Sequence, residues 1–162
     1  MKAISKINNT LAQIEGAVMV FWFAIVLVVM TCQVVSRYIF NAPIAWSEEF
    51  ARYSFVWISY IGCAYCVSVD AHTGITAFRD ALPPKAKKLT TVLGNVVVMI
   101  VFIRLLPIAM KFIGKNSKFL TSMMRIPFKY LYYSLPVGCV LTVVHLILKS
   151  ILLFAPDTIE KA

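Results

Sequence analysis

Charged residues are scarce in this chain: they make up 14% of its 162 residues, while hydrophobic residues make up 60%. Acidic residues are the fewest, with 7 Asp and Glu against 16 Lys and Arg. A soluble domain of this size keeps a polar outer face on its helices, which so few charges cannot supply. The shortage of charge therefore excludes an ordinary soluble domain and indicates a chain whose outer surface meets lipid.

What the sequence has instead is long apolar runs. A helix of about 20 apolar residues crosses the hydrocarbon core of a bilayer, and four runs reach or approach that length, at about 11–38, 53–69, 89–112 and 130–154. No segment alternates polar and apolar residues as a membrane β-strand does. We expect an all-α membrane protein with four transmembrane helices and a short amphipathic interfacial segment leading into the second. Residues 1–154 would form a single four-helix domain, and 155–162 a short C-terminal tail.

The first run could be compared with a cleaved signal peptide, because Lys2 and Lys6 precede it. It is too long for that role, and no small-x-small cleavage site follows it before Arg37. We therefore expect a retained helix. Basic residues are divided almost evenly between the two predicted membrane faces, and the two early lysines slightly favour both termini on the inside. Because the basic residues flank apolar helices, contact with lipid head groups is expected and nucleic acid is not.

Several features needed for independent chemistry or transport are missing. There is no inverted repeat, no pair of broken helices and no acidic residue in the middle of a predicted span, so the chain has no means of moving a polar solute alone. Glu15 invites comparison with small homodimeric drug–proton antiporters, but it lies near the start of the first run, and we expect it to be interfacial. Transport would therefore depend on a partner.

Redox chemistry is the other alternative. All 4 cysteines lie inside predicted spans. Cys63 and Cys66 have C-x-x-C spacing, which suggests the alternative of a membrane thiol or quinone redox protein. Buried cysteine acting as a small apolar side chain is the favoured interpretation. His72 and His145 could suggest haem ligation, but one is predicted at a span boundary and the other inside a span. We expect no enzyme activity, no metal and no cofactor.

The densest polar signal is the stretch from Arg37 to Tyr53. Asn-Ala-Pro at 41–43 is a turn and helix-start signal. After it, aromatic residues recur at helical spacing on one face, at Trp46, Phe50, Tyr53 and Trp57. Glu48 and Arg52 stand four residues apart on another face, and Glu48 and Glu49 fall in the first helical turn, where the helix dipole favours carboxylates. Two carboxylates and an arginine exceed what anchoring needs, so we expect a docking surface for another polypeptide.

Arg104 interrupts the third run about eight residues before its end, which places it roughly 12 Å deep. An arginine at depth costs ~2.5–3.5 kcal/mol on insertion scales and normally finds a partner or water. Glu48 and Glu49 are predicted on the same membrane side as Arg104. We predict that one of them approaches Arg104, within the chain or across a subunit boundary. The alternative is that Arg104 extends unpaired towards the interface.

In its order of motifs the chain resembles the small membrane subunit, the DctQ-like subunit, of tripartite ATP-independent periplasmic (TRAP) transporters. The resemblance covers nearly the whole chain, and its most specific part runs from Ser36 to Tyr53. Further matching elements are Val56-Trp57, Gly62-Cys63-Ala64, Asp70-Ala71-His72 with Ile75, Ile126-Pro127 with Tyr130, and Leu135-Pro136-Val137-Gly138. No single element is a catalytic signature, and the specificity comes from their order in a four-span chain.

The resemblance implies a transporter subunit in the bacterial inner membrane. In that family the small subunit pairs with a large DctM-like membrane subunit that holds the substrate and sodium sites. A periplasmic binding protein delivers an organic acid such as a C4-dicarboxylate or a sialic acid. The small subunit would scaffold the large one. By this resemblance the subunit interface would include Arg37, Trp46, Glu48, Glu49 and Arg52. The residue pattern described above adds Trp57 and Arg104 to the expected interface.

Overall fold

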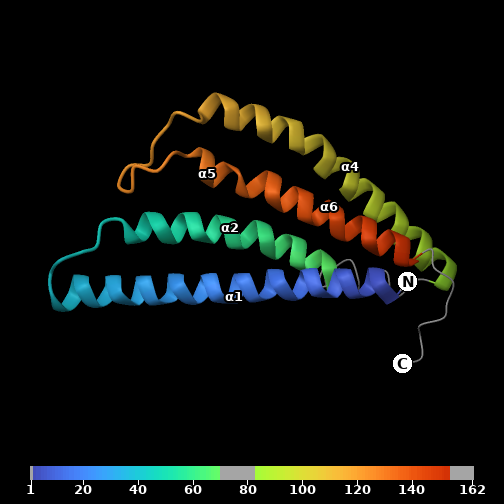
Figure 1. Cartoon of the computed structure of the whole chain (residues 1–162), viewed down its shortest axis with the longest axis horizontal. Helices are drawn as coiled ribbons and strands as arrows, with labels where there is room; N and C mark the ends of the chain where they lie inside the picture. The colour runs from blue at the N-terminus through green and yellow to red at the C-terminus, as the bar shows by residue number, and fades with distance from the viewer. Residues whose placement is uncertain (1, 70–82, 154–162) are drawn as a thin grey trace.

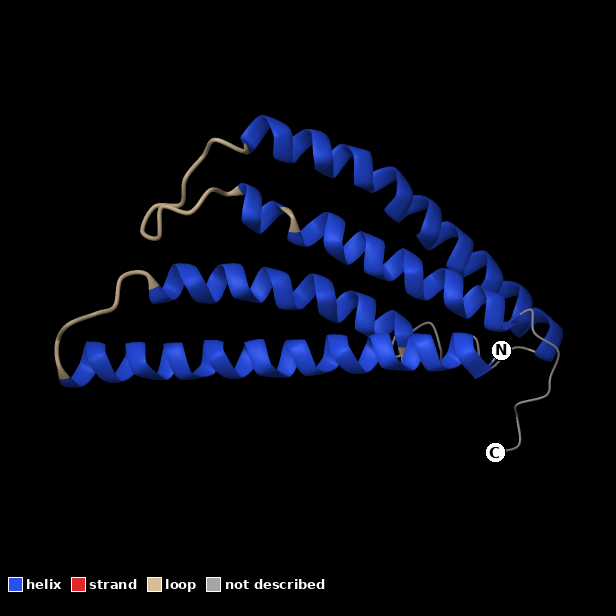
Figure 2. Ribbon diagram, in the orientation of Figure 1, coloured by secondary structure: helices blue, strands red, loops and turns tan. Residues whose placement is uncertain are grey.

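The computed structural model describes residues 2–69 and 83–153, and these residues are almost entirely helical. The helices are α1 (Lys2–Ile39), α2 (Ser47–Ser68), α4 (Pro84–Asn116), α5 (Lys129–Tyr132) and α6 (Ser134–Leu153). They lie roughly side by side in one curved row (Figures 1 and 2), in which α1 packs on α2, α2 on α6 and α6 on α4. Helices α1 and α6 also meet over a shorter stretch.

Three helical segments are long and apolar enough to cross a membrane: Ile4–Ile39, Leu89–Asn116 and Lys129–Leu152. The expected all-helical membrane fold is thus confirmed, and three of the four expected spans are supported. Helix α2 is not among the segments that are apolar enough to cross a membrane by composition, so it remains a predicted fourth span. The boundaries also differ from the expectation, because α1 begins at Lys2 and is continuous past position 11.

The distribution of side chains is inverted relative to a soluble protein. Large apolar residues on the α1 surface are widely exposed, for example Phe21 at 67% and Val28 at 63%. The buried positions hold mostly small or polar side chains, including Ala64, Ser54 and Thr142. Small and polar residues allow membrane helices to approach closely and to hydrogen bond, while lipid covers the apolar exterior. This pattern agrees with a bundle surrounded by lipid.

Gly138 sets the closest approach in the middle of the row. A Cβ atom at this position would lie 2.8 Å from the Cβ of Tyr60 and 3.0 Å from its carbonyl oxygen. Only glycine therefore permits α6 to lie this close to α2.

Pro136 explains why the last span is divided. Proline has no N–H group, and its ring excludes the carbonyl of the residue four positions earlier, here Tyr132. Helix α5 ends at Tyr132, and α6 begins at Ser134 after a single intervening residue. The two helices still form one continuous candidate span.

Candidate functional site

The corner between α1 and α2 is fixed by side chains that bind the backbone. Asn41 has a φ of 50°, a left-handed conformation that asparagine tolerates better than most residues. The Gln33 Oε1 atom accepts a hydrogen bond from the Ile44 amide at 2.6 Å. The buried Ser47 hydroxyl donates to the Ile44 carbonyl at 2.7 Å. The turn signal in the sequence is confirmed, and helix α2 starts from a defined direction.

Glu49 connects this corner to a distant loop. Its carboxylate accepts hydrogen bonds from three consecutive backbone amides, those of Ser122 at 3.1 Å, Met123 at 2.9 Å and Met124 at 2.8 Å. The Tyr53 hydroxyl donates to the same carboxylate at 2.7 Å. Successive amides pointing to one spot form an anion-binding concavity, and here the anion is the chain's own side chain. We call this contact the Glu49 latch.

The Glu49 latch changes the acidity of the carboxyl group. Partial burial raises the pKa of Glu49, but the hydrogen bonds from Tyr53, Met124, Met123 and Ser122 stabilise the charged form and lower it by more. The net effect is a pKa below the usual value of 4.5. Glu49 is therefore ionised at neutral pH, as the latch requires.

The loop held by the latch is itself ordered, and we call residues 117–128 the hairpin loop. The Thr121 amide donates to the Ile126 carbonyl at 2.9 Å, and the Phe128 amide donates to the Phe119 carbonyl at 2.9 Å. Arg125 has a φ of 51°, which closes the turn. The ring of Phe128 meets Tyr53 of α2 at 6.0 Å, edge to face. The hairpin loop thus has one defined position against the start of α2.

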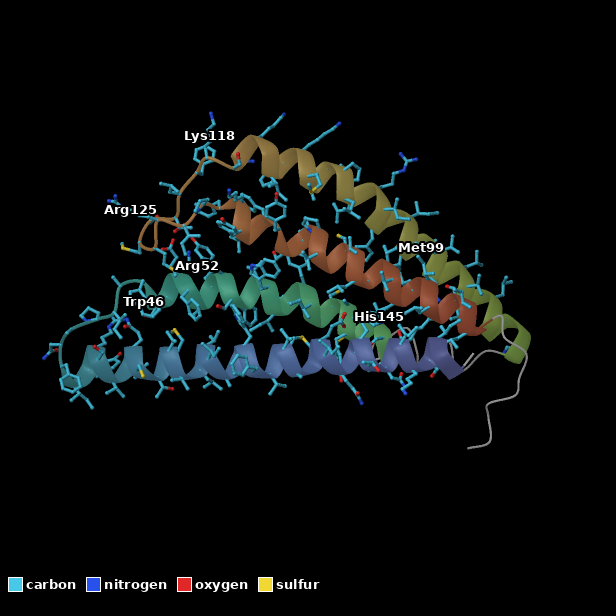
Figure 3. All side chains as sticks on the ribbon, in the orientation of Figure 1. Trp46, Arg52, Met99, Lys118, Arg125 and His145 are labelled. Carbon is cyan, nitrogen blue, oxygen red and sulfur yellow. The ribbon has the colours of Figure 1, made fainter. Side chains whose placement is uncertain are left out.

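Several of the predicted interface residues surround this region (Figure 3). A surface groove of about 430 Å³ is lined by Glu48, Glu49, Arg52 and Tyr53 of α2, Ala45 before it, and Ser122, Met123, Phe128 and Leu131. Trp46 and Arg52 lie at the same end of the molecule as Lys118 and Arg125 of the hairpin loop, far from His145. Arg37, Glu48 and Arg52 are exposed, and Trp46 is 45% exposed. Trp57 is half-buried.

Arg104 behaves differently from the other predicted interface residues. It is exposed on α4 and forms no ion pair with Glu48 or Glu49 in the part of the chain that the structure describes. The carboxylate of Glu49 is directed to the hairpin loop instead. A pairing of Arg104 with Glu48 or Glu49 is therefore absent among the described residues, and a pairing across a subunit boundary stays a prediction.

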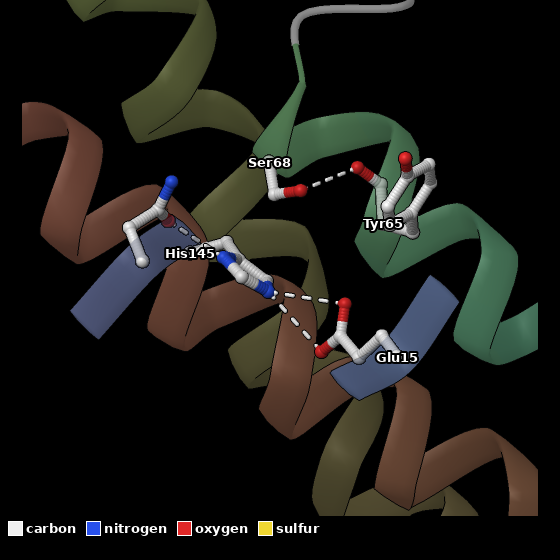
Figure 4. A network of polar contacts seen from close by, with 5 residues as sticks. Glu15, Tyr65, Ser68 and His145 are labelled. Carbon is white, nitrogen blue, oxygen red and sulfur yellow. Dashed lines mark hydrogen bonds and ion pairs between the residues drawn. The ribbon is translucent and has the colours of Figure 1, made fainter. Parts of the chain in front are cut away.

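A second polar cluster was missed in the sequence. His145 is fully buried in α6, and its Nδ1 atom lies 2.8 Å from Asn8 Oδ1. Its Nε2 atom lies 3.1 and 3.2 Å from the two Glu15 carboxylate oxygens (Figure 4). Glu15 is only 5% exposed and faces His145, a contact that the sequence did not predict. Asn8 and Glu15 stand seven residues apart, two helical turns, and this spacing on one face was the available signal.

The haem and thiol alternatives find no support at these positions. Both ring nitrogens of His145 already have side-chain partners, and His72 lies outside the described residues. Cys63 and Cys66 are free cysteines on α2, in the helix as expected. No group of three or more potential metal ligands occurs among residues 2–69 and 83–153.

Comparison with known proteins agrees with the fold and the motif order. The family described as tripartite ATP-independent periplasmic transporters, DctQ component, matches residues 13–155. The chain is 32% identical over 143 residues to the sialic acid TRAP transporter small permease protein SiaQ of Vibrio cholerae, covering 88% of this chain and 81% of that protein. It is 26% identical over 141 residues to the sialic acid TRAP transporter permease protein SiaT of Haemophilus influenzae, covering 87% of this chain but 22% of that protein.

A further relative carries a different substrate in its name. The C4-dicarboxylate TRAP transporter small permease protein DctQ of Vibrio cholerae is 25% identical over 85 residues, which is 52% of this chain and 37% of that protein. The family match spans most of the chain, and the match to SiaQ spans most of both proteins. The chain therefore belongs to the DctQ family, the small permease subunits of tripartite ATP-independent periplasmic transporters.

Proposed function

We propose that this chain scaffolds a larger, ion-coupled membrane subunit that takes up an organic acid across the bacterial inner membrane. The observation that carries the proposal is the match to SiaT, in which a segment equivalent to this chain makes up about a fifth of a longer permease. This match supports a role for the chain beside a larger permease part. A sialic acid and a C4-dicarboxylate are the candidate substrates, since they appear in the names of the relatives.

The geometry supports a rigid supporting role at the end of the molecule that carries the hairpin loop. The Glu49 latch, the Gln33 contact and the aromatic pair Tyr53–Phe128 hold three chain segments together there. A binding surface that is already rigid before a partner binds loses less conformational entropy on binding. Around it stand exposed Arg37, Trp46, Glu48 and Arg52, and tryptophan and arginine are the residue types that most often dominate binding energy at interfaces. We propose that these residues contact the large subunit.

The function is tested by co-expressing this chain with its large subunit and binding protein in cells lacking other uptake routes. Removing this chain should abolish uptake of radiolabelled sialic acid or succinate, and restoring it should recover uptake. Purified chain alone in vesicles should transport neither compound. Transport by the chain alone would overturn the scaffolding proposal.

The interface is tested by Arg52→Glu. We expect this variant to reduce co-purification of the large subunit roughly tenfold, because losing one anchoring residue at an interface costs about 1–2 kcal/mol. Arg52→Lys should have a smaller effect. Lys6→Glu is the matched control, since Lys6 is exposed near the opposite end of α1. If Arg52→Glu and Lys6→Glu copurify equally well with the large subunit, α2 does not contribute Arg52 to the interface.

A further inference from the structure

The cluster of Asn8, Glu15 and His145 lies apart from the proposed interface, because His145 is far from Trp46 and Arg52 (Figure 3). All three residues are at least 94% buried, and two of them are ionisable. They lie within the candidate spans Ile4–Ile39 and Lys129–Leu152. Ionisable residues buried in membrane spans are costly and generally serve a function. The arrangement of donors and acceptors indicates what this cluster binds.

Hydrogen-bond chemistry fixes one ring nitrogen first. The Asn8 Oδ1 atom only accepts hydrogen bonds, so the His145 Nδ1 atom 2.8 Å away must carry a hydrogen. The Nε2 atom faces both carboxylate oxygens of Glu15 at 3.1 and 3.2 Å. If Nε2 were unprotonated and Glu15 ionised, two hydrogen-bond acceptors would face each other without a hydrogen to share. A further proton must therefore lie on Nε2 or on the carboxyl group.

We propose that Asn8, Glu15 and His145 form a proton-binding site that holds one proton between the imidazole ring and the Glu15 carboxylate. With the proton on Nε2 the pair is an imidazolium and a carboxylate, and with it on Glu15 the pair is a neutral imidazole and a carboxylic acid. Both forms are electrically neutral overall. Neutrality is what allows the cluster to be buried, because an uncompensated buried carboxylate is strongly unfavourable.

The other charged residues near the starts of α1 and α4 and near the end of α6 are lysines. Helix α4 has Lys85, Lys87 and Lys88 near its start and no titratable residue from Leu89 to Ile103. On α1, Lys6 is exposed. On α6, Lys149 lies one turn beyond His145 and donates to the Val67 carbonyl at 2.6 Å.

Near its C-terminal end, helix α2 contributes polar but uncharged side chains. The ring of Tyr65 lies against Gly16, next to Glu15, and the Ser68 hydroxyl donates to the Tyr65 carbonyl (Figure 4). Cys66 is half-buried on the same helix. Glu15 is therefore the carboxylate that the structure places against His145.

Nuclear magnetic resonance tests the proposal directly. The chain has two histidines, so His72→Gln leaves His145 as the sole ring to observe in ¹⁵N-histidine-labelled full-length protein in nanodiscs. At pH 7.0 we expect either both ring nitrogens protonated, or Nδ1 alone protonated together with a carboxylic-acid infrared band that Glu15→Gln removes. A neutral ring without that band, protonated on either nitrogen alone, would overturn the proposal.

Discussion

At the scale of single residues, Glu49 has a more specific role than its neighbour Glu48. The sequence places both in the first turn of α2, where the helix dipole favours a carboxylate. Only the fold distinguishes them, because Glu49 receives three amide hydrogen bonds from the hairpin loop, whereas Glu48 is exposed. Glu49 also accepts a hydrogen bond from the Tyr53 hydroxyl one helical turn further on. Replacing them should therefore have unequal effects.

Glu49→Gln should loosen the hairpin loop. An amide oxygen carries no formal charge and accepts hydrogen bonds from backbone amides more weakly than a carboxylate does. We expect hydrogen exchange at residues 122–124 to quicken roughly threefold or more in nanodiscs. Glu48→Gln is the matched control and should leave exchange there unchanged. Equal exchange in both variants would show that the latch does not order the loop.

Acid should loosen the loop in the same way. The folded-state pKa of Glu49 lies below the usual 4.5 because of its hydrogen bonds. The latch therefore contributes its full stabilisation above the unfolded-state pKa, and that contribution is lost as pH falls through the lower folded-state value. Hydrogen exchange at residues 122–124, corrected for intrinsic rates, should rise below about pH 4.5 in the wild type. No such rise should occur in Glu49→Gln.

At the scale of helices, α2 and α6 form the central pair, and their approach depends on Gly138. The glycine in span four is visible in the sequence, but the residue it faces is not. Tyr60 lies on a helix some 78 positions away, and its Cβ and carbonyl oxygen occupy the space beside Gly138. Helix pairing of this kind is decided by three-dimensional packing.

Gly138→Ala should destabilise the bundle by about 1–3 kcal/mol, because the added methyl group would overlap Tyr60. For a chain of this size we expect a fall of about 2–10 °C in the melting temperature measured in detergent. Gly94→Ala is the control, since no atom lies within 4 Å of a Cβ built there. If the two variants have the same melting temperature, a methyl group at position 138 does not disturb the packing of α6 on α2.

At the scale of the whole molecule, two polar contacts lie towards opposite ends of the helix row. The Glu49 latch joins the α1–α2 corner to the hairpin loop, and the His145 cluster joins α1 to α6 towards the other end. The corner and the hairpin loop must therefore lie on the same side of a membrane. Helix α2 has 22 residues, about 33 Å, which is enough to cross the hydrocarbon core of about 30 Å. We predict that it is the fourth span.

Cysteine labelling from one side of the membrane tests this topology. In a cysteine-free background, Ala42→Cys and Ser122→Cys should react with an impermeant maleimide from the same side, and Ser5→Cys from the other. The early lysines predict that both termini lie inside. In that orientation, Ala42→Cys and Ser122→Cys should react from the periplasm. Labelling of Ala42→Cys and Ser5→Cys from one side would show that α1 does not cross as predicted.

The sequence was sufficient for whatever depends on local order along the chain. Long apolar runs predicted the membrane helices, Asn-Ala-Pro predicted the α1–α2 turn, and the succession of motifs from Ser36 to Gly138 indicated the family. It was not sufficient for contacts between distant residues. The contact of Glu15 was not predicted because its partner, His145, is 130 positions away.

The division has a physical cause. Lipid exposure, helix length and turn geometry are set by a residue and its near neighbours, so the amino-acid sequence by itself determined that this is a helical membrane subunit of the DctQ family. Pairing a buried carboxylate requires a donor brought by another part of the chain. Only the tertiary structure decided that Glu49 binds the amides of the hairpin loop, and that Glu15 faces the ring of His145.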